Sequence, residues 1–193
     1  MSRICVFCGS SEGNRPVYRE RASEVGRALA ERSIGVVYGG GNTGLMGALA
    51  DAALVAGGEV IGVIPRRLAE REVAHAGLTQ LHVVETMHER KALMTELSDA
   101  FLTLPGGFGT LDELFEAITW RQLGFHDKRC GILDIDGYFD GLLAFVDRAV
   151  SDGFIHPADG ARFLRGDATG ALLDELLAPG SVDLRQISTS PVK

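Results

Sequence analysis

Cysteine and lysine are scarce in this chain of 193 residues, which contains three of each. So small and odd a number of cysteines does not provide the disulfide framework of a small secreted domain. The formal net charge of −7 argues against a broad surface for nucleic acid or for anionic lipid. We therefore expect neither nucleic acid nor a membrane among its partners. A small phosphorylated ligand remains compatible with this charge, because a few local N–H groups and arginines can hold it.

Long hydrophobic runs are also missing, since no apolar stretch approaches the roughly 20 residues that a transmembrane helix needs. Residues 1–7 read as the start of a core strand and lack the architecture of a secretory signal peptide. The five histidines show no metal-ligand spacing such as HExxH, and we expect no metal site. A cytoplasmic protein is the simplest interpretation.

Glycine, in contrast, is abundant, and its 25 residues cluster at the ends of apolar segments. Short apolar segments alternate with stretches of helical periodicity. The expected strands are 4–8, 35–38, 60–64, 81–84, 100–104 and 131–133, and the expected helices are 17–31, 44–56, 89–98, 111–123, 139–151 and 172–177. Repeated strand–helix units predict an α/β fold, namely a Rossmann-like doubly wound parallel sheet with helices on both faces.

We expect one nucleotide-binding domain over residues 1–180, followed by a flexible tail at 181–193. Residues 66–80 combine weak periodicity with mixed charge, which indicates a surface excursion. In a sheet of this type, ligands bind outside the carboxyl ends of the strands. The loops after the strands are therefore candidate sites, and three of them are rich in glycine: 9–14, 39–44 and 105–110.

The loop 39–44 contains a G-x-G-x-x-G pattern between an expected strand and an expected helix, which is the context of a dinucleotide-binding fingerprint. That fingerprint also needs an acidic residue at the end of the next strand, where this chain has Arg66 and Arg67. Two arginines would suit a 2′-phosphate, so an NADP-dependent oxidoreductase is one alternative. A second alternative is that these glycines bind no ligand and only permit tight packing of the strand against the helix.

The segment Pro105–Glu113 reads PGGFGTLDE. Its glycines can expose backbone N–H groups at a helix N-terminus, where the helix dipole favours an anion. We expect Thr110 to cap this helix and to offer its hydroxyl to the same anion. Two roles remain open for Glu113. Its spacing from Thr110 is that of a capping box, and a glutamate in the first turn would also lie close to a bound sugar.

The segment 85–91 follows the next expected strand and opens a helix. Arg90 can grip a phosphate or a ribose through two hydrogen bonds, and Lys91 adds a point charge. A solvated basic turn is the alternative for this pair. Met87 can pack against a base or fill the core.

Together these motifs resemble the LONELY GUY (LOG) family, the cytokinin riboside 5′-monophosphate phosphoribohydrolases, long mislabelled as lysine decarboxylases. Residues 105–113 fit the PGGxGTxxE signature of that family, and the similarity extends to 7–11, 39–47 and Met87-x-x-Arg90-Lys91. The resemblance implies hydrolysis of the N-glycosidic bond of adenosine 5′-monophosphates, N6-prenylated or not, which releases the free base and ribose 5-phosphate. It also implies a homodimer with sites near the interface.

The resemblance assigns catalysis to Glu113 and Arg90. A carboxylate can stabilise an oxocarbenium-like ribosyl centre and position or deprotonate water, and this chemistry needs no metal or cofactor. Arg90 would orient the ribose or its phosphate. The residues expected to bind the substrate are Ser10, Gly40, Gly41, Gly44, Glu85, Met87, Arg90, Lys91, Gly106, Gly107, Phe108, Gly109, Thr110, Leu111 and Asp112.

Two further alternatives concern the class of the protein. The same fold can serve as a non-catalytic nucleotide-binding carrier, which would bind without turnover. A decarboxylase that uses pyridoxal phosphate would need a Schiff-base lysine, but none of Lys91, Lys128 and Lys193 lies in a recognisable site. The Cys5-x-x-Cys8 pair lies in an expected strand and indicates core thiols rather than a redox motif.

Overall fold

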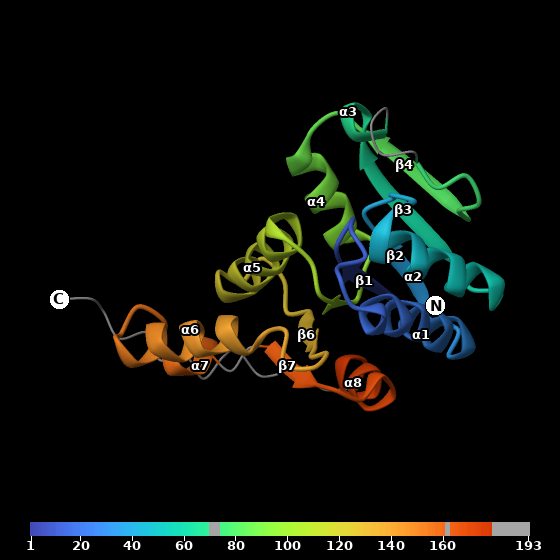
Figure 1. The fold of residues 1–193 in the computed structure, drawn as a ribbon. Helices are drawn as coiled ribbons and strands as arrows, with labels where there is room; N and C mark the ends of the chain where they lie inside the picture. The colour runs from blue at the N-terminus through green and yellow to red at the C-terminus, as the bar shows by residue number, and fades with distance from the viewer. Residues whose placement is uncertain (70–73, 161–162, 179–193) are drawn as a thin grey trace.

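The computed structural model describes residues 1–69, 74–160 and 163–178. These residues form one sheet of seven parallel strands in the order β4-β3-β2-β1-β5-β6-β7 (Figure 1). The strands are β1 (Arg3–Phe7), β2 (Gly35–Tyr38), β3 (Val60–Pro65), β4 (Gln80–Val84), β5 (Ala100–Thr103), β6 (Arg129–Leu133) and β7 (Phe163–Gly166). The tail expected at 181–193 lies outside the described residues.

Helices cover both faces of the sheet, as the sequence predicts (Figure 1). They are α1 (Pro16–Glu31), α2 (Gly44–Val55), α3 (Arg66–Ala69), α4 (Met87–Glu96), α5 (Phe108–Gln122), α6 (Asp140–Ser151), α7 (Pro157–Gly160) and α8 (Thr169–Leu176). Among the described helices, none has the length and apolar composition needed to cross a bilayer.

The side chains of β1 point alternately to the two faces of the sheet, and each face has its own hydrophobic core. Ile4 and Val6 pack with α1, α2 and α8 on one face, whereas Cys5 and Phe7 pack with α4 and α5 on the other. Successive side chains of a strand point to opposite faces, so a central strand covered on both sides must be apolar throughout. The edge strand β4 differs, and it leaves Val83 exposed.

Most expected boundaries differ from the structure by one to three residues. Helix α5 begins at Phe108, three residues before the expected start, and Pro65 belongs to β3 instead of following it. The expected surface excursion at 66–80 begins with the short helix α3. The sequence analysis also missed β7, whose four residues are too few to show a period of two, and the single-turn helix α7.

The chain changes direction between β1 and β5, which are neighbours in the sheet. From β1 it crosses through α1 to β2 on one side, and from β5 it crosses through α5 to β6 on the other. The loops after these two strands start side by side, where the backbone N–H of Gly9 donates to the carbonyl of Pro105 at 3.0 Å, and the chain then continues from them to opposite sides of the sheet. Ligands of doubly wound sheets bind at such a point.

Candidate active site

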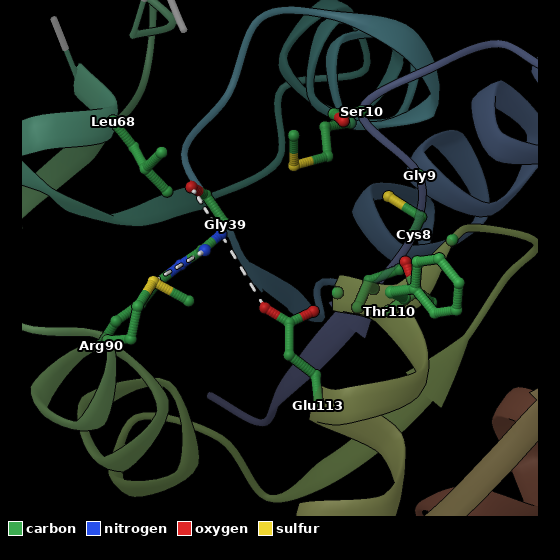
Figure 2. Close-up of a pocket in the computed structure, with 14 residues that line it drawn as sticks. Cys8, Gly9, Ser10, Gly39, Leu68, Arg90, Thr110 and Glu113 are labelled. Carbon is green, nitrogen blue, oxygen red and sulfur yellow. Dashed lines mark hydrogen bonds and ion pairs between the residues drawn. The ribbon is translucent and has the colours of Figure 1, made fainter. Parts of the chain in front are cut away.

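A cavity of about 330 Å³ lies at this switch point, between the first turns of α4 and α5 (Figure 2). Its volume falls in the range of about 300–1,000 Å³ that is typical of small-molecule sites. The lining residues are Val6, Cys8, Gly9, Ser10, Gly39, Met46, Leu68, Met87, Arg90, Gly107, Phe108, Gly109, Thr110 and Glu113. The cavity therefore draws on β1, on the loops after β1, β2 and β5, and on residues of α2, α3, α4 and α5, which are far apart in the sequence.

The start of α5 gives the cavity an anion-binding end. Gly107 is the N-cap residue and offers no side-chain cap. The first intrahelical bond at this end runs from the N–H of Leu111 to the carbonyl of Gly107, so the N–H groups of the three preceding helical residues have no helical acceptor. Together with the helix dipole, they favour a phosphate or carboxylate at this position.

Glycine occupies positions 106, 107 and 109 of this loop for different structural reasons. A Cβ atom on Gly107 or Gly109 would meet no atom within 4 Å, so these two residues leave space next to the helix start. A Cβ atom on Gly106 would lie 2.1 Å from Oγ1 of Thr110 and 2.8 Å from the backbone nitrogen of Gly9. Gly106 is therefore needed for the loops after β1 and β5 to approach each other, and it lies behind the cavity wall.

The expected capping role of Thr110 is wrong. Thr110 is the third residue of α5 and is buried, and Gly107 occupies the N-cap position. The capping box with Thr110, one of the two roles left open for Glu113, is consequently not formed. A capping box is present in α4 instead, where Thr86 and Glu89 exchange hydrogen bonds. The structure thus leaves the carboxylate of Glu113 available to the cavity.

Glu113 is almost buried, with 11% of its side chain exposed. Burial raises the pKa of Glu113 to about 7, although the neighbouring Arg90 guanidinium acts in the opposite direction. Oε1 of Glu113 lies 3.8 Å from Nη2 of Arg90, and Figure 2 shows the two side chains reaching toward each other from α5 and α4. A carboxyl group with such a pKa can both accept and release a proton near neutral pH.

Arg90 is held by the backbone of the sheet. Its Nε donates to the carbonyl of Val63 and its Nη2 donates to the carbonyl of Gly39, each at 3.1 Å. A Cβ atom on Gly39 would lie 2.1 Å from Nη2 of Arg90, so only glycine lets the guanidinium pass this closely. Two backbone carbonyls, of Gly39 just after β2 and of Val63 within β3, therefore set the position of the charge before any ligand binds.

The structure brings eight of the expected site residues to the cavity: Ser10, Met87, Arg90, Gly107, Phe108, Gly109, Thr110 and Glu113. It places the others outside the cavity wall. Glu85 is exposed and accepts from Arg66 at 2.8 Å. Lys91 extends to carboxylates on α5. The remaining expected residues off the wall are Gly40, Gly41, Gly44, Gly106, Leu111 and Asp112.

Sequence reasoning did not assign six of the lining residues: Val6, Cys8, Gly9, Gly39, Met46 and Leu68. Gly9, Gly39 and Met46 lie in motifs that the sequence singles out, so proximity to those motifs was a usable signal. Leu68 gave none, because it belongs to a segment without periodicity. With Met87 it makes part of the wall apolar, opposite the anion-binding start of α5.

Other ligands find less support in this geometry. Arg66 and Arg67 lie in α3 and do not line the cavity. In the part of the chain that the structure describes, no three His, Cys, Asp or Glu side chains gather as metal ligands.

Comparison with known proteins shows the family. A family model described as "Possible lysine decarboxylase" matches residues 46–176. An Oryza sativa subsp. japonica protein named "Probable cytokinin riboside 5′-monophosphate phosphoribohydrolase" is 51% identical over 174 residues, which are 90% of this chain and 77% of the relative. A cytokinin riboside 5′-monophosphate phosphoribohydrolase of Arabidopsis thaliana is 53% identical over 155 residues, with coverage of 80% and 73%.

Solved structures show the same fold at much lower identity. The molybdenum cofactor carrier protein of Chlamydomonas reinhardtii superposes with a TM-score of 0.70 at 19% identity, covering 92% of this chain and 98% of the other. The molybdenum cofactor binding protein of Rippkaea orientalis gives 0.68 at 18% identity, with coverage of 90% and 94%. At this distance the likeness concerns architecture alone.

Proposed function

The chain belongs to the LONELY GUY family of cytokinin riboside 5′-monophosphate phosphoribohydrolases, and from this premise we propose that it hydrolyses the N-glycosidic bond of adenosine 5′-monophosphates, with or without an N6-prenyl group. The products are the free base and ribose 5-phosphate. One observation carries the proposal: a buried carboxyl group, Glu113, faces a fixed guanidinium in a cavity whose other end is a helix N-terminus.

The two chemically different ends of the cavity suggest an orientation for the substrate. The 5′-phosphate meets the free N–H groups at the start of α5, and Ser10 lies on the same wall. The ribose then lies against the neighbouring Arg90 and Glu113 side chains, both of which line the cavity. The base extends toward the apolar wall of Met46, Leu68 and Met87. Binding energy at the phosphate, remote from the bond that breaks, serves to orient the reacting atoms.

The reaction needs one carboxylate in its ionised form. As the bond between C1′ and the base nitrogen breaks, its electron pair leaves with the base and positive charge develops on the ribose. The carboxylate of Glu113 stabilises that charge and takes a proton from a water molecule, whose oxygen bonds to C1′. The proton passes on to the departing base, which balances the reaction. Arg90 orients the ribose and its phosphate.

The expected substrate residues outside the cavity act, in this proposal, through their neighbours. Glu85 binds Arg66 at the start of α3, the helix that carries Leu68. Gly44 packs on the backbone of Ser10, where a Cβ atom would come within 2.3 Å. Gly40 and Gly41 belong to the loop between β2 and α2, which leads into Gly44. Leu111 and Asp112 belong to the first turns of α5.

A carrier without turnover is the competing function, and the fold likeness to cofactor carriers suggests it. That likeness rests on 18–19% identity, whereas the relatives at 51–53% identity carry a phosphoribohydrolase name. The enzyme is therefore favoured.

Lysine decarboxylation is disfavoured by the site itself. A pyridoxal phosphate enzyme needs a lysine for its Schiff base. Of the lysines in the described residues, Lys91 is held by carboxylates on α5 and Lys128 donates to the carbonyl of Thr95. Neither lines the cavity, so these residues do not fit that cofactor.

A parallel incubation tests the function. The purified protein is given isopentenyl-AMP, AMP and CMP, and released base is measured by chromatography. We expect base from the adenosine monophosphates. We also expect Glu113→Gln to lower turnover by about 100- to 10,000-fold with nucleotide binding retained. Saturable binding without any released base in the wild type would instead establish a carrier.

We further propose a homodimer with the sites near its interface. Phe115, Leu123 and Phe125 expose large apolar surfaces on and just after α5, the helix that carries Glu113, and contact between two copies would cover them. Light scattering after gel filtration measures the mass. A monomer at micromolar concentration would contradict the proposal.

A cytoplasmic location is proposed on chemical grounds. The three cysteines are buried and free, which suits a reducing compartment. Cell fractionation followed by immunoblotting tests it.

A further inference from the structure

Lys91 follows Arg90 in the sequence but points to a different place. Its ammonium group donates to Oδ2 of Asp112 at 3.0 Å and also to Glu116. Only 12% of the Lys91 side chain and 20% of the Glu116 side chain are exposed. The Lys91–Glu116 contact is therefore a largely enclosed bridge from α4 to α5, unlike a solvated surface pair, whose contribution is small, whereas the Asp112 side chain is 58% exposed.

The two carboxylates bound by Lys91 flank Glu113 on α5. Asp112 precedes it directly, and Glu116 follows it by three residues, a spacing that brings side chains together on a helix. Glu113, Glu116 and Lys91 also line another, much smaller cavity of about 10 Å³, which shares Glu113 with the main cavity. Glu113 thus lines the main cavity and also a small space that it shares with the Lys91–Glu116 pair.

The charged and titratable groups around Glu113 come from three parts of the fold. Arg90 and Lys91 extend from α4, Asp112 and Glu116 from α5, and the thiols of Cys5 and Cys8 from β1 and its end. Burial is the main cause that raises the pKa of both thiols well above the usual range, so they are neutral near pH 7.

The four charged groups have opposite effects on Glu113. Burial is the largest influence on the pKa of Glu113 and raises it. Arg90 and Lys91 lower this pKa, whereas Asp112 and Glu116 raise it. Without Lys91, two negative charges beside Glu113 would be opposed by Arg90 alone.

We propose that Lys91 is a positioning residue that acts on Glu113 without touching the substrate: its ammonium group binds Asp112 and Glu116, fixes α5 against α4, and offsets the negative charge that these carboxylates place beside Glu113. The inference rests on the proposed role of Glu113 as the carboxylate that meets the ribose. It gives Lys91 a function different from the direct substrate contact that the family resemblance implies.

Charge-matched variants test the inference. The set is Lys91→Met, Glu116→Gln, the double variant, and Lys91→Arg, with Arg148→Met as a control that removes an exposed bridge to Asp152 on α6. Rates of base release from AMP are measured between pH 5 and pH 9. Two quantities are compared. The first is the midpoint pH at which kcat/KM falls on the acidic side of the profile, here called the acidic limb. The second is the value of KM.

The two single variants are expected to move the acidic limb in opposite directions. Lys91→Met raises it by about one pH unit and Glu116→Gln lowers it by a similar amount, because each removes a charge of opposite sign. The double variant returns the limb toward that of the wild type, and Lys91→Arg keeps it there. Arg148→Met leaves it unmoved. A Lys91→Met variant with an unmoved limb and a raised KM would show that Lys91 binds substrate, and the proposal would fail.

A second measurement does not depend on turnover. Titration of ¹³C-labelled glutamate carboxyls by NMR, with the Glu113 signal assigned from Glu113→Gln, follows Glu113 in the wild type and in Lys91→Met. We expect a higher pKa in the variant. If the wild type releases no base, the proposed function fails while this titration still decides the role of Lys91. An identical Glu113 titration in both proteins would overturn it.

Discussion

Nη2 of Arg90 lies 3.8 Å from Oε1 of Glu113, although the two residues belong to different helices and both side chains are almost buried. This separation is longer than a hydrogen bond. The guanidinium is fixed by strand carbonyls, and the carboxyl group is held by α5. The pair is consequently preorganised around the space that the proposed ribose occupies.

The pH dependence of turnover follows from the environment of Glu113. Burial raises the pKa of Glu113 to about 7, and the proposed reaction needs the ionised form. We therefore expect kcat/KM for AMP to fall about tenfold for each pH unit below about 7 and to level off above it. Stopped assays across this range measure the limb. A rate that is flat down to pH 5 would contradict a base with this pKa.

The ionisation of Glu113 also affects the free energy of unfolding. A rise in pH, which is expected to increase kcat/KM, is expected to lower the stability of the folded protein. Because the pKa of Glu113 is raised from 4.5 to about 7 in the folded protein, folding favours the protonated form. This stabilising contribution is complete below pH 4.5 and is lost as the pH rises through 7. Glu113→Gln remains neutral, so we expect it to exceed the wild type in unfolding free energy by on the order of 2–3 kcal/mol at pH 8.

That difference should disappear at pH 4.5, where both side chains are neutral. Urea unfolding at the two pH values measures it. A gain of equal size at both values would point to packing and not to charge.

Gly39→Ala tests the fixed position of Arg90. The new Cβ atom would lie 2.1 Å from Nη2 of Arg90 and 3.1 Å from the sulfur of Met46, so the guanidinium must move. We expect kcat/KM to fall by about 100-fold, with the helical content of the protein unchanged by circular dichroism.

Gly141→Ala in α6 is the matched control. Its Cβ atom would meet nothing within 4 Å, and alanine favours a helix over glycine by up to about 1 kcal/mol. This control should keep full activity and gain slightly in stability. Full activity in Gly39→Ala would show that Arg90 can act from another position.

Gly109→Ala tests the anion-binding end of the cavity. A Cβ atom at this position meets no protein atom within 4 Å, so the fold should tolerate it and Tm should not fall. The methyl group would instead occupy space beside the N–H groups that we assign to the phosphate. We expect binding of AMP to weaken on the order of tenfold in isothermal titration calorimetry. Unchanged affinity would place the phosphate elsewhere.

Much of this protein could be inferred without its structure, because local patterns carry the information. Apolar strands alternating with amphipathic helices predict the parallel sheet, which is confirmed; that the loops after β1 and β5 are neighbours at its switch point is known only from the structure. Cys5 and Cys8 are confirmed as core thiols. β7 escaped this reasoning, since four residues of mixed polarity do not show a period.

The sequence by itself determined the fold class, the succession of the main strands along the chain, and the glycine loops at which a nucleotide would bind, since each depends on residues that are close in the chain. Tertiary structure alone decided the roles of three residues. Glu113 is free of a capping role because α5 begins at Phe108. Lys91 meets α5 and not the cavity, and Leu68 enters the wall. These outcomes depend on how helices and loops from distant parts of the chain pack against one sheet, and local spacing does not encode that packing.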